Sequence, residues 1–201
     1  MSNTPPEVDA TQLEMKDQAT GMDVDYCIAL AGSLFGGSEG SLEFVSLDSQ
    51  SDGFRKLADG EVDVFAGGTW NLANDINEPT TGLGFSFSQP YFYGFSDDED
   101  NLCLVTREDD PQWATFVYWV RAASTYAEVM GISQVAANEM PEVLLYGTGF
   151  RRMFRDAIVQ CGNYAEAYER NLESIIPRAG RNLLNAHPHD GPQFYPMPGI
   201  L

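Results

Sequence analysis

Residues 57–76, LADGEVDVFAGGTWNLANDI, decide the fold that the sequence predicts. Their centre is a short apolar run, 62–65, that lies between Gly60 and the pair Gly67 and Gly68. An apolar run of this length bounded by glycines is typical of a strand that is buried in a sheet. We therefore expect a buried strand here, followed by a polar stretch over 69–81.

Helix and strand patterns alternate on both sides of this run. Apolar residues spaced three and four apart indicate helices, and short apolar or alternating runs indicate strands. We expect helices over 23–35, 54–59, 113–131, 150–161 and 164–170, and further strands over 42–47 and 102–106. Short strands between helices indicate a layered α/β domain.

Charge limits the partners that this chain can have. The sequence holds 30 acidic and only 11 basic residues, which gives a formal net charge of −19. So few cations cannot neutralise a phosphate backbone, so we expect no nucleic-acid partner. No apolar run approaches the roughly 18–20 residues that span a bilayer, so we expect a soluble chain with no membrane insertion. The acidic excess suits a milieu of high salt, where screening weakens self-repulsion.

No metal or cofactor site is predicted. Cys27, Cys103 and Cys161 lie far apart and lack zinc-type spacing, so small buried hydrophobes are the simplest interpretation. The cluster His187-Pro188-His189-Asp190 has metal-ligand chemistry, but a proline between the histidines in a Pro-rich tail favours packing instead. The chain also lacks a nucleophile elbow and a phosphate-binding loop with its lysine, so we expect no enzyme activity.

The two ends of the sequence differ from its centre. Residues 1–21 are polar and acidic and read as a loose leader, with no secretory signal in the sequence as given. Residues 186–201 form a Pro-rich tail. The domain is therefore expected over 22–185.

Five segments, in order, resemble a known family. They are DVDYCIALAGSLFGG (23–37), LADGEVDVFAGGTWNLANDI (57–76), FSFSQPYFYG (85–94), DDPQWATFVYWVRAASTYAEVMGI (109–132) and GNYAEAYERNL (162–172). Together they resemble the amino-acid-binding periplasmic proteins of bacterial ABC transporters, solute-binding protein family 3, in the general L-amino-acid subgroup.

The resemblance implies a fold, a function and a location. The fold would be the first lobe of a type 2 periplasmic binding protein, with one mostly parallel sheet of four or five strands and strand 102–106 returning antiparallel. The function would be binding of an amino acid or similar small polar solute for ABC-type transport, with a transporter permease as partner. The location would be periplasmic or extracellular.

The sequence departs from the family in its overall plan. Only the acidic stretch 94–101 stands where the family has a whole second lobe. The opening strand of the family is also not evident before Gly21. We therefore expect a domain reduced to lobe 1, with an incomplete or misassembled gene product as an alternative.

The resemblance also implies a set of ligand-binding residues, which are Gly67, Thr69, Trp70, Asn74 and Asp75. Thr69 matches a hydroxyl residue of the family. Asn74 stands where the family has an arginine that pairs with the α-carboxylate of the ligand. A neutral amide forms weaker hydrogen bonds to a carboxylate than a guanidinium does, so we expect weakened or altered ligand binding.

An interaction module is the competing interpretation. Loss of the second lobe would expose Trp70 and the aromatic corner that includes Tyr91, Phe92 and Phe95. Exposed aromatic patches usually mark an interface, so this face would then dock a protein partner or a second copy.

Overall fold

The computed structural model describes residues 19–36, 42–76, 84–94, 101–144 and 147–183. The elements in chain order are α2 (Met22–Leu34), α3 (Gln50–Ala58), β1 (Phe65–Thr69), α4 (Leu72–Ile76), β2 (Phe85–Phe87), β3 (Leu102–Arg107), α5 (Pro111–Val129), α6 (Met153–Cys161) and α7 (Tyr164–Asn171), with 3-10 helices at Gln134–Glu139, Thr148–Phe150 and Gly180–Leu183. The predicted α/β class is confirmed.

The sheet is smaller than the sequence predicted. It has three strands among the described residues, in the order β1-β3-β2, and both ladders are antiparallel. The antiparallel return of β3 is therefore confirmed, and β1 and β2 point the same way. The expectation of four or five strands with mostly parallel pairing is wrong for this part of the chain. Residues 42–47 are not a strand, since within the ranges that the structure describes they pair with no other strand.

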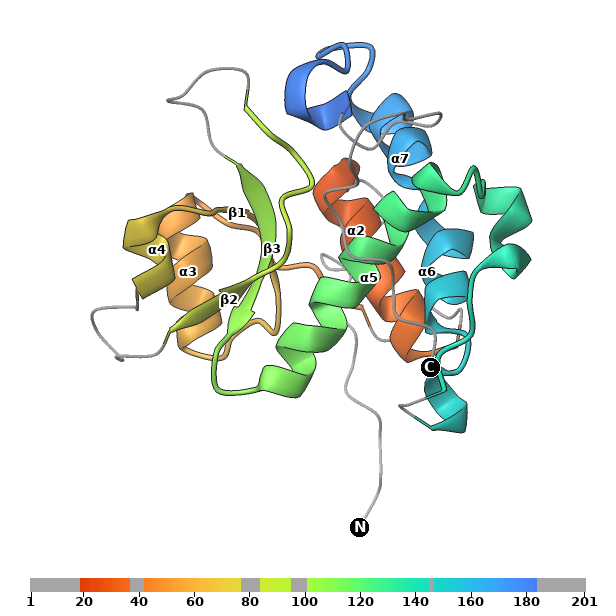
Figure 1. Ribbon diagram of the computed structural model, residues 1–201. Coiled ribbons are helices and arrows are strands. Elements are labelled where there is room, and N and C mark those ends of the chain that lie inside the picture. The colour runs from red at the N-terminus through yellow and green to blue at the C-terminus, as the bar shows by residue number, and fades with distance from the viewer. Residues whose placement is uncertain (1–18, 37–41, 77–83, 95–100, 145–146, 184–201) are drawn as a thin grey trace, which may run out of the picture.

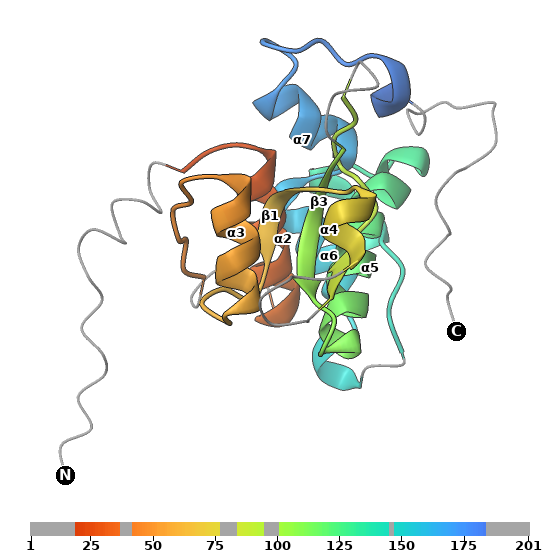
Figure 2. The same ribbon diagram turned by 90° about the vertical axis from the view of Figure 1, so that its left-hand side faces the viewer.

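Helices cover both faces of the sheet. Figure 1 shows α3 and α4 on one side of β1 and β3, and α2, α5 and α6 on the other; Figure 2 shows the same layers from the side of α3 and α4. Successive strand residues point to opposite faces, so Leu104 joins the core under α2 and α5, while Val105 joins a smaller cluster with Phe54 and Leu57 of α3.

The helical side is closely packed. Gly32 of α2 meets α6 so tightly that a Cβ on it would stand 2.6 Å from Gln160 Cγ. Ser33 Oγ of α2 donates a hydrogen bond to the Met153 carbonyl at 2.8 Å. Asn163 begins α7 with a reciprocal capping box to Glu166, which satisfies the free N–H groups of the first turn. The contacts of Gly32 and Ser33 hold α2 against α6, and the other side of α2 lies toward β1.

A buried polar network joins the helices to residues 88–94. Arg121 of α5 is only 1% exposed and donates to the Pro90 carbonyl at 2.8 Å. Tyr164 Oη donates to the Tyr91 carbonyl, also at 2.8 Å. Tyr91 is thereby fixed beside Tyr26 of α2, with 4.9 Å between the ring centroids.

Several predictions made from sequence fall outside the described residues. They concern most of the leader, Phe95 with the acidic stretch around it, and the tail with its histidine cluster. Within the described ranges, no helix is long and apolar enough to cross a membrane. No cluster of three metal-ligating side chains occurs in those ranges either. The three cysteines are free thiols; Cys103 and Cys161 are buried and Cys27 is half-buried.

Candidate functional site

Four of the predicted ligand-binding residues meet at the C-terminal end of β1. Thr69 is the last residue of the strand, Trp70 follows it, and Asn74 and Asp75 lie on the short helix α4. The Asn74 side-chain amide donates to the Thr69 carbonyl at 2.9 Å. Asn74, which stands where the family that the sequence resembles has an arginine, therefore closes the turn after β1.

Thr69 and Trp70 differ sharply in exposure. Thr69 is 6% exposed, and its Oγ1 has no hydrogen-bond partner among the described residues. A buried hydroxyl without a partner costs about 1–3 kcal/mol of stability. Trp70 is 48% exposed and Leu72 is 77% exposed. The end of β1 thus combines an unsatisfied hydroxyl with an exposed apolar surface.

Gly67, the fifth predicted residue, lies beside a carboxylate that the sequence did not indicate. It has a φ of +89°, and a Cβ at this position would stand 3.0 Å from Oδ2 of Asp23 on α2. Both the backbone and the close approach therefore favour glycine. The sequence did not indicate Asp23 as a site residue, because it lies far from β1 along the chain. An acidic residue in the first turn of a helix is also common and by itself suggests no binding role.

Asp23 is held between two elements. The Tyr91 hydroxyl donates a hydrogen bond to its Oδ1 at 2.5 Å. Burial raises the pKa of this carboxyl above its ordinary value, and the bond from Tyr91 opposes that rise. The residue still exposes more than a third of its surface, because the carboxyl faces an open groove rather than a closed core.

Of Tyr91, Phe92 and Phe95 in the aromatic corner, the structure describes Tyr91 and Phe92. Tyr91 is only 1% exposed, so the prediction that it anchors an exposed interface is wrong; the network around Arg121 and Tyr164 buries it. Phe92 is half-buried and forms an isolated antiparallel bridge with Leu102. Trp70 remains exposed.

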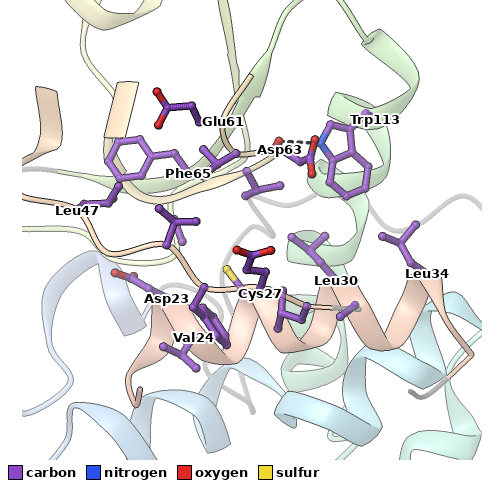
Figure 3. Close-up of a pocket in the computed structure, with 18 of the residues that line it drawn as sticks. Asp23, Val24, Cys27, Leu30, Leu34, Leu47, Glu61, Asp63, Phe65 and Trp113 are labelled. Carbon is purple, nitrogen blue, oxygen red and sulfur yellow. Dashed lines mark hydrogen bonds between the residues drawn. The ribbon is translucent and has the colours of Figure 1, made fainter. Parts of the chain in front are cut away.

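A groove of about 470 Å³ lies on the other side of β1, away from β3. Its floor is α2, one wall is formed by residues 62–66, and the opposite wall by residues 42–47. Figure 3 shows Cys27, Leu30 and Leu34 on the floor, with Asp63 and Phe65 above them. Trp113 of α5 lines the same groove and donates from its Nε1 to the Asp63 carbonyl at 2.9 Å. The sequence predicted a strand at 42–47 but gave no signal for a groove.

Comparisons with known proteins identify the fold. No family model and no curated protein sequence matches the chain. A solved structure of an ABC transporter periplasmic binding protein from Brucella ovis, with glutathione bound, is similar to it at a TM-score of 0.61 and 20% sequence identity. The similarity covers 81% of this chain and 84% of that chain. The chain therefore has a periplasmic-binding-protein-like fold.

Proposed function

We propose that this chain is a non-enzymatic solute-binding domain for an amino acid or a similar small polar solute. The solute would bind at the C-terminal end of β1, next to Gly67, Thr69 and Trp70. The domain would act in ABC-type amino-acid transport, with a transporter permease as its partner, in the periplasm or outside the cell. The binding-protein-like fold and the sequence resemblance both support this proposal.

The observation that carries the proposal is the unsatisfied hydroxyl of Thr69. A buried polar group without a partner calls for an explanation, and a ligand that supplies the missing hydrogen bond is one. Trp70 beside it offers an aromatic surface for the rest of a solute.

The charges at this end of β1 indicate which solutes would bind well. Asn74 contributes no positive charge and is already engaged with the Thr69 carbonyl. Asp75 is exposed on α4 and would favour a cationic group on the solute. We therefore expect a free carboxylate to be held weakly and an ammonium to be preferred.

We further propose that the domain is a single lobe over residues 22–185, with the stretch 94–101 in place of a second lobe. A one-lobed domain would leave the bound solute open to water on one side. Hydrogen bonds and interactions between charges are weaker next to water. This is a second reason to expect a low affinity for the solute.

Isothermal titration with the standard amino acids tests the solute site. Asn74→Arg should tighten amino-acid binding by about 1.5–3 kcal/mol, the contribution of a hydrogen bond to a charged group. Gln112→Arg adds the same charge at an exposed position on α5 and is the matched control. Thr69→Val should abolish binding while leaving the fold intact. The proposal fails if neither the unmodified chain nor Asn74→Arg binds any amino acid.

A second candidate function is that of an interaction module, which would dock a protein partner or a second copy. It is favoured by two exposed apolar side chains after β1. Trp70 and Leu72 are 48% and 77% exposed, and they stand two residues apart after β1. Sedimentation at low and high salt would detect self-association, which the charge of −19 opposes until it is screened. Loss of association in Trp70→Ala, but not in Leu183→Ala, would favour this candidate; a monomer in all conditions would exclude self-association there.

A further inference from the structure

The outer edge of β1 lacks a strand partner in the described part of the chain. β1 is an edge strand that pairs only with β3 there. The backbone groups of an antiparallel strand point alternately to its two edges, so half of those in β1 point away from β3. Gln50 of α3 binds two of them, donating to the Gly67 carbonyl and accepting from the Thr69 N–H, each at 3.0 Å. The same edge continues toward residue 62 along the wall of the groove.

The opposite wall has strand-like character without being a strand. Along residues 42–47, Leu42 and Phe44 are half-buried while Glu43 and Val45 are exposed, which is the alternation of a strand with one covered face. A hydrogen bond from Lys56 Nζ of α3 to the Ser46 carbonyl, at 2.8 Å, ties this wall to α3. Two extended segments therefore flank the groove.

The groove between these walls has an apolar floor that is incompletely covered. Leu34 at the far end of α2 is half-buried, and Phe35 just beyond it is 48% exposed. Val45 and Leu47 on the far wall are 39% and 38% exposed although both line the groove. An occupant would bury this surface, and each 100 Å² of apolar area removed from water contributes about 2.5 kcal/mol.

The charge of the groove identifies the chemistry of an occupant. Four carboxylates line it, from Asp23, Glu43, Glu61 and Asp63, and no lysine, arginine or histidine of the described residues does. Glu61 is bound by Arg55 at 2.9 Å and Asp23 accepts a hydrogen bond from Tyr91, while Asp63 lies on the wall above α2 (Figure 3). The net charge of −19 adds a long-range attraction for cations and repels a second copy of this chain.

We propose that this groove binds an extended, basic peptide segment of another protein by strand addition. The segment lies between residues 62–66 and residues 42–47, and its backbone hydrogen-bonds to the outer edge at residues 64–66, beyond the groups that Gln50 already binds. Every second side chain is apolar and packs on Val24, Cys27 and Leu30 of α2, while lysine or arginine side chains lie near the carboxylates. Strand addition gives affinity through the backbone and specificity through alternate side chains. This site adjoins the solute site at the end of β1, because Asp23 lines the groove and also lies beside Gly67.

Fluorescence anisotropy with a labelled peptide, KVTVTVK-amide, tests the proposal on the full chain. We expect saturable binding that weakens at least tenfold when the central valine is N-methylated, because this change keeps the side chain but removes a backbone donor. An acidic counterpart, EVTVTVE-amide, should bind at least tenfold more weakly. Equal binding of the N-methylated peptide would overturn strand addition.

Variants of the chain test whether the peptide binds in the groove. Leu47→Arg should weaken binding at least tenfold, whereas Val135→Arg, at a position 94% exposed and outside the groove lining, should change it less than twofold. Asp63→Asn should weaken binding severalfold, with Glu139→Gln as its charge-matched control. In ¹⁵N spectra the backbone amides of Val64 and Ala66 should shift on binding. Equal effects of both arginine variants, or self-association that Leu47→Arg abolishes, would overturn the proposal.

Discussion

The two sides of helix α2 are packed to very different extents. Toward α6 the helices are in contact, with no room for a Cβ on Gly32 and with Ile158 fully buried. Toward β1 the same helix forms the floor of a groove of about 470 Å³. One helix therefore takes part both in a finished core and in an incompletely covered surface.

This difference shows where the stability of the domain resides and where a ligand can be accommodated. Native interiors are packed about as densely as organic crystals, so removing atoms there leaves a cavity. A side chain that lines an open groove already contacts water, so its truncation costs much less. The packed side should therefore determine stability, and the groove side should determine binding.

The largest expected effect comes from a buried ion pair away from the groove, between Glu128 of α5 and Arg178. Arg178 donates to both carboxylate oxygens of Glu128, at 2.5 and 2.9 Å, and both side chains are largely buried. Glu128→Gln leaves the arginine charge without its counter-charge and should cost about 3–5 kcal/mol. Glu61→Gln breaks a half-exposed pair with Arg55 at the groove and should cost far less, because water screens an exposed pair. Urea unfolding measures the loss in free energy of unfolding for both variants. Similar losses would mean that the exposed pair at the groove stabilises the fold as much as the buried pair does.

A pair of truncations compares the packing directly. Ile158→Ala removes a fully buried side chain and should lower the free energy of unfolding by about 2–5 kcal/mol. Leu47→Ala removes a side chain that is 38% exposed at the groove and should cost less than about 1 kcal/mol. Thermal unfolding of the two variants against the unmodified chain checks both values. A loss of several kcal/mol for Leu47→Ala would show that residues 42–47 belong to the core.

Local pattern was sufficient to predict most of the elements. The spacing of apolar residues predicted α2, α5 and α7 to within a few residues, since amphipathic helices have a strong period. The glycine-bounded run at 62–65 predicted a strand, and β1 begins at Phe65, the last residue of that run. The antiparallel return of β3 came from the family resemblance rather than from any periodicity.

Features that depend on distant partners were not predictable. Residues 42–47 have strand propensity, but a strand also needs a neighbour to share its hydrogen bonds, and none is present in the described chain. Tyr91 looked exposed because its burial depends on Arg121 and Tyr164, which follow it by many residues. Asp23 became a site residue only when folding brought it to Gly67.

The smallest expected effect concerns Asp23, which lies where the packed side and the groove meet. Burial raises its pKa above the ordinary value of 3.8, so the folded chain holds this proton more tightly than the unfolded chain does. Its contribution to stability therefore decreases as pH rises above about 3.8 toward the raised pKa of the folded state. Asp23→Asn removes this dependence and can still accept the hydrogen bond from Tyr91.

The stability of Asp23→Asn relative to the unmodified chain should thus increase with pH through that window and then become constant. Below the ordinary pKa the two proteins should differ least, because Asp23 is then protonated in both the folded and unfolded states. Urea unfolding from pH 3.5 to 8 measures this difference, and Asp75→Asn, which removes one carboxylate from the exposed surface of α4, controls for net charge. A difference that stays constant with pH would mean that the Asp23 carboxyl is as well hydrated as a surface group. The groove would then be open to water along its whole length, including the end where α2, β1 and Tyr91 meet.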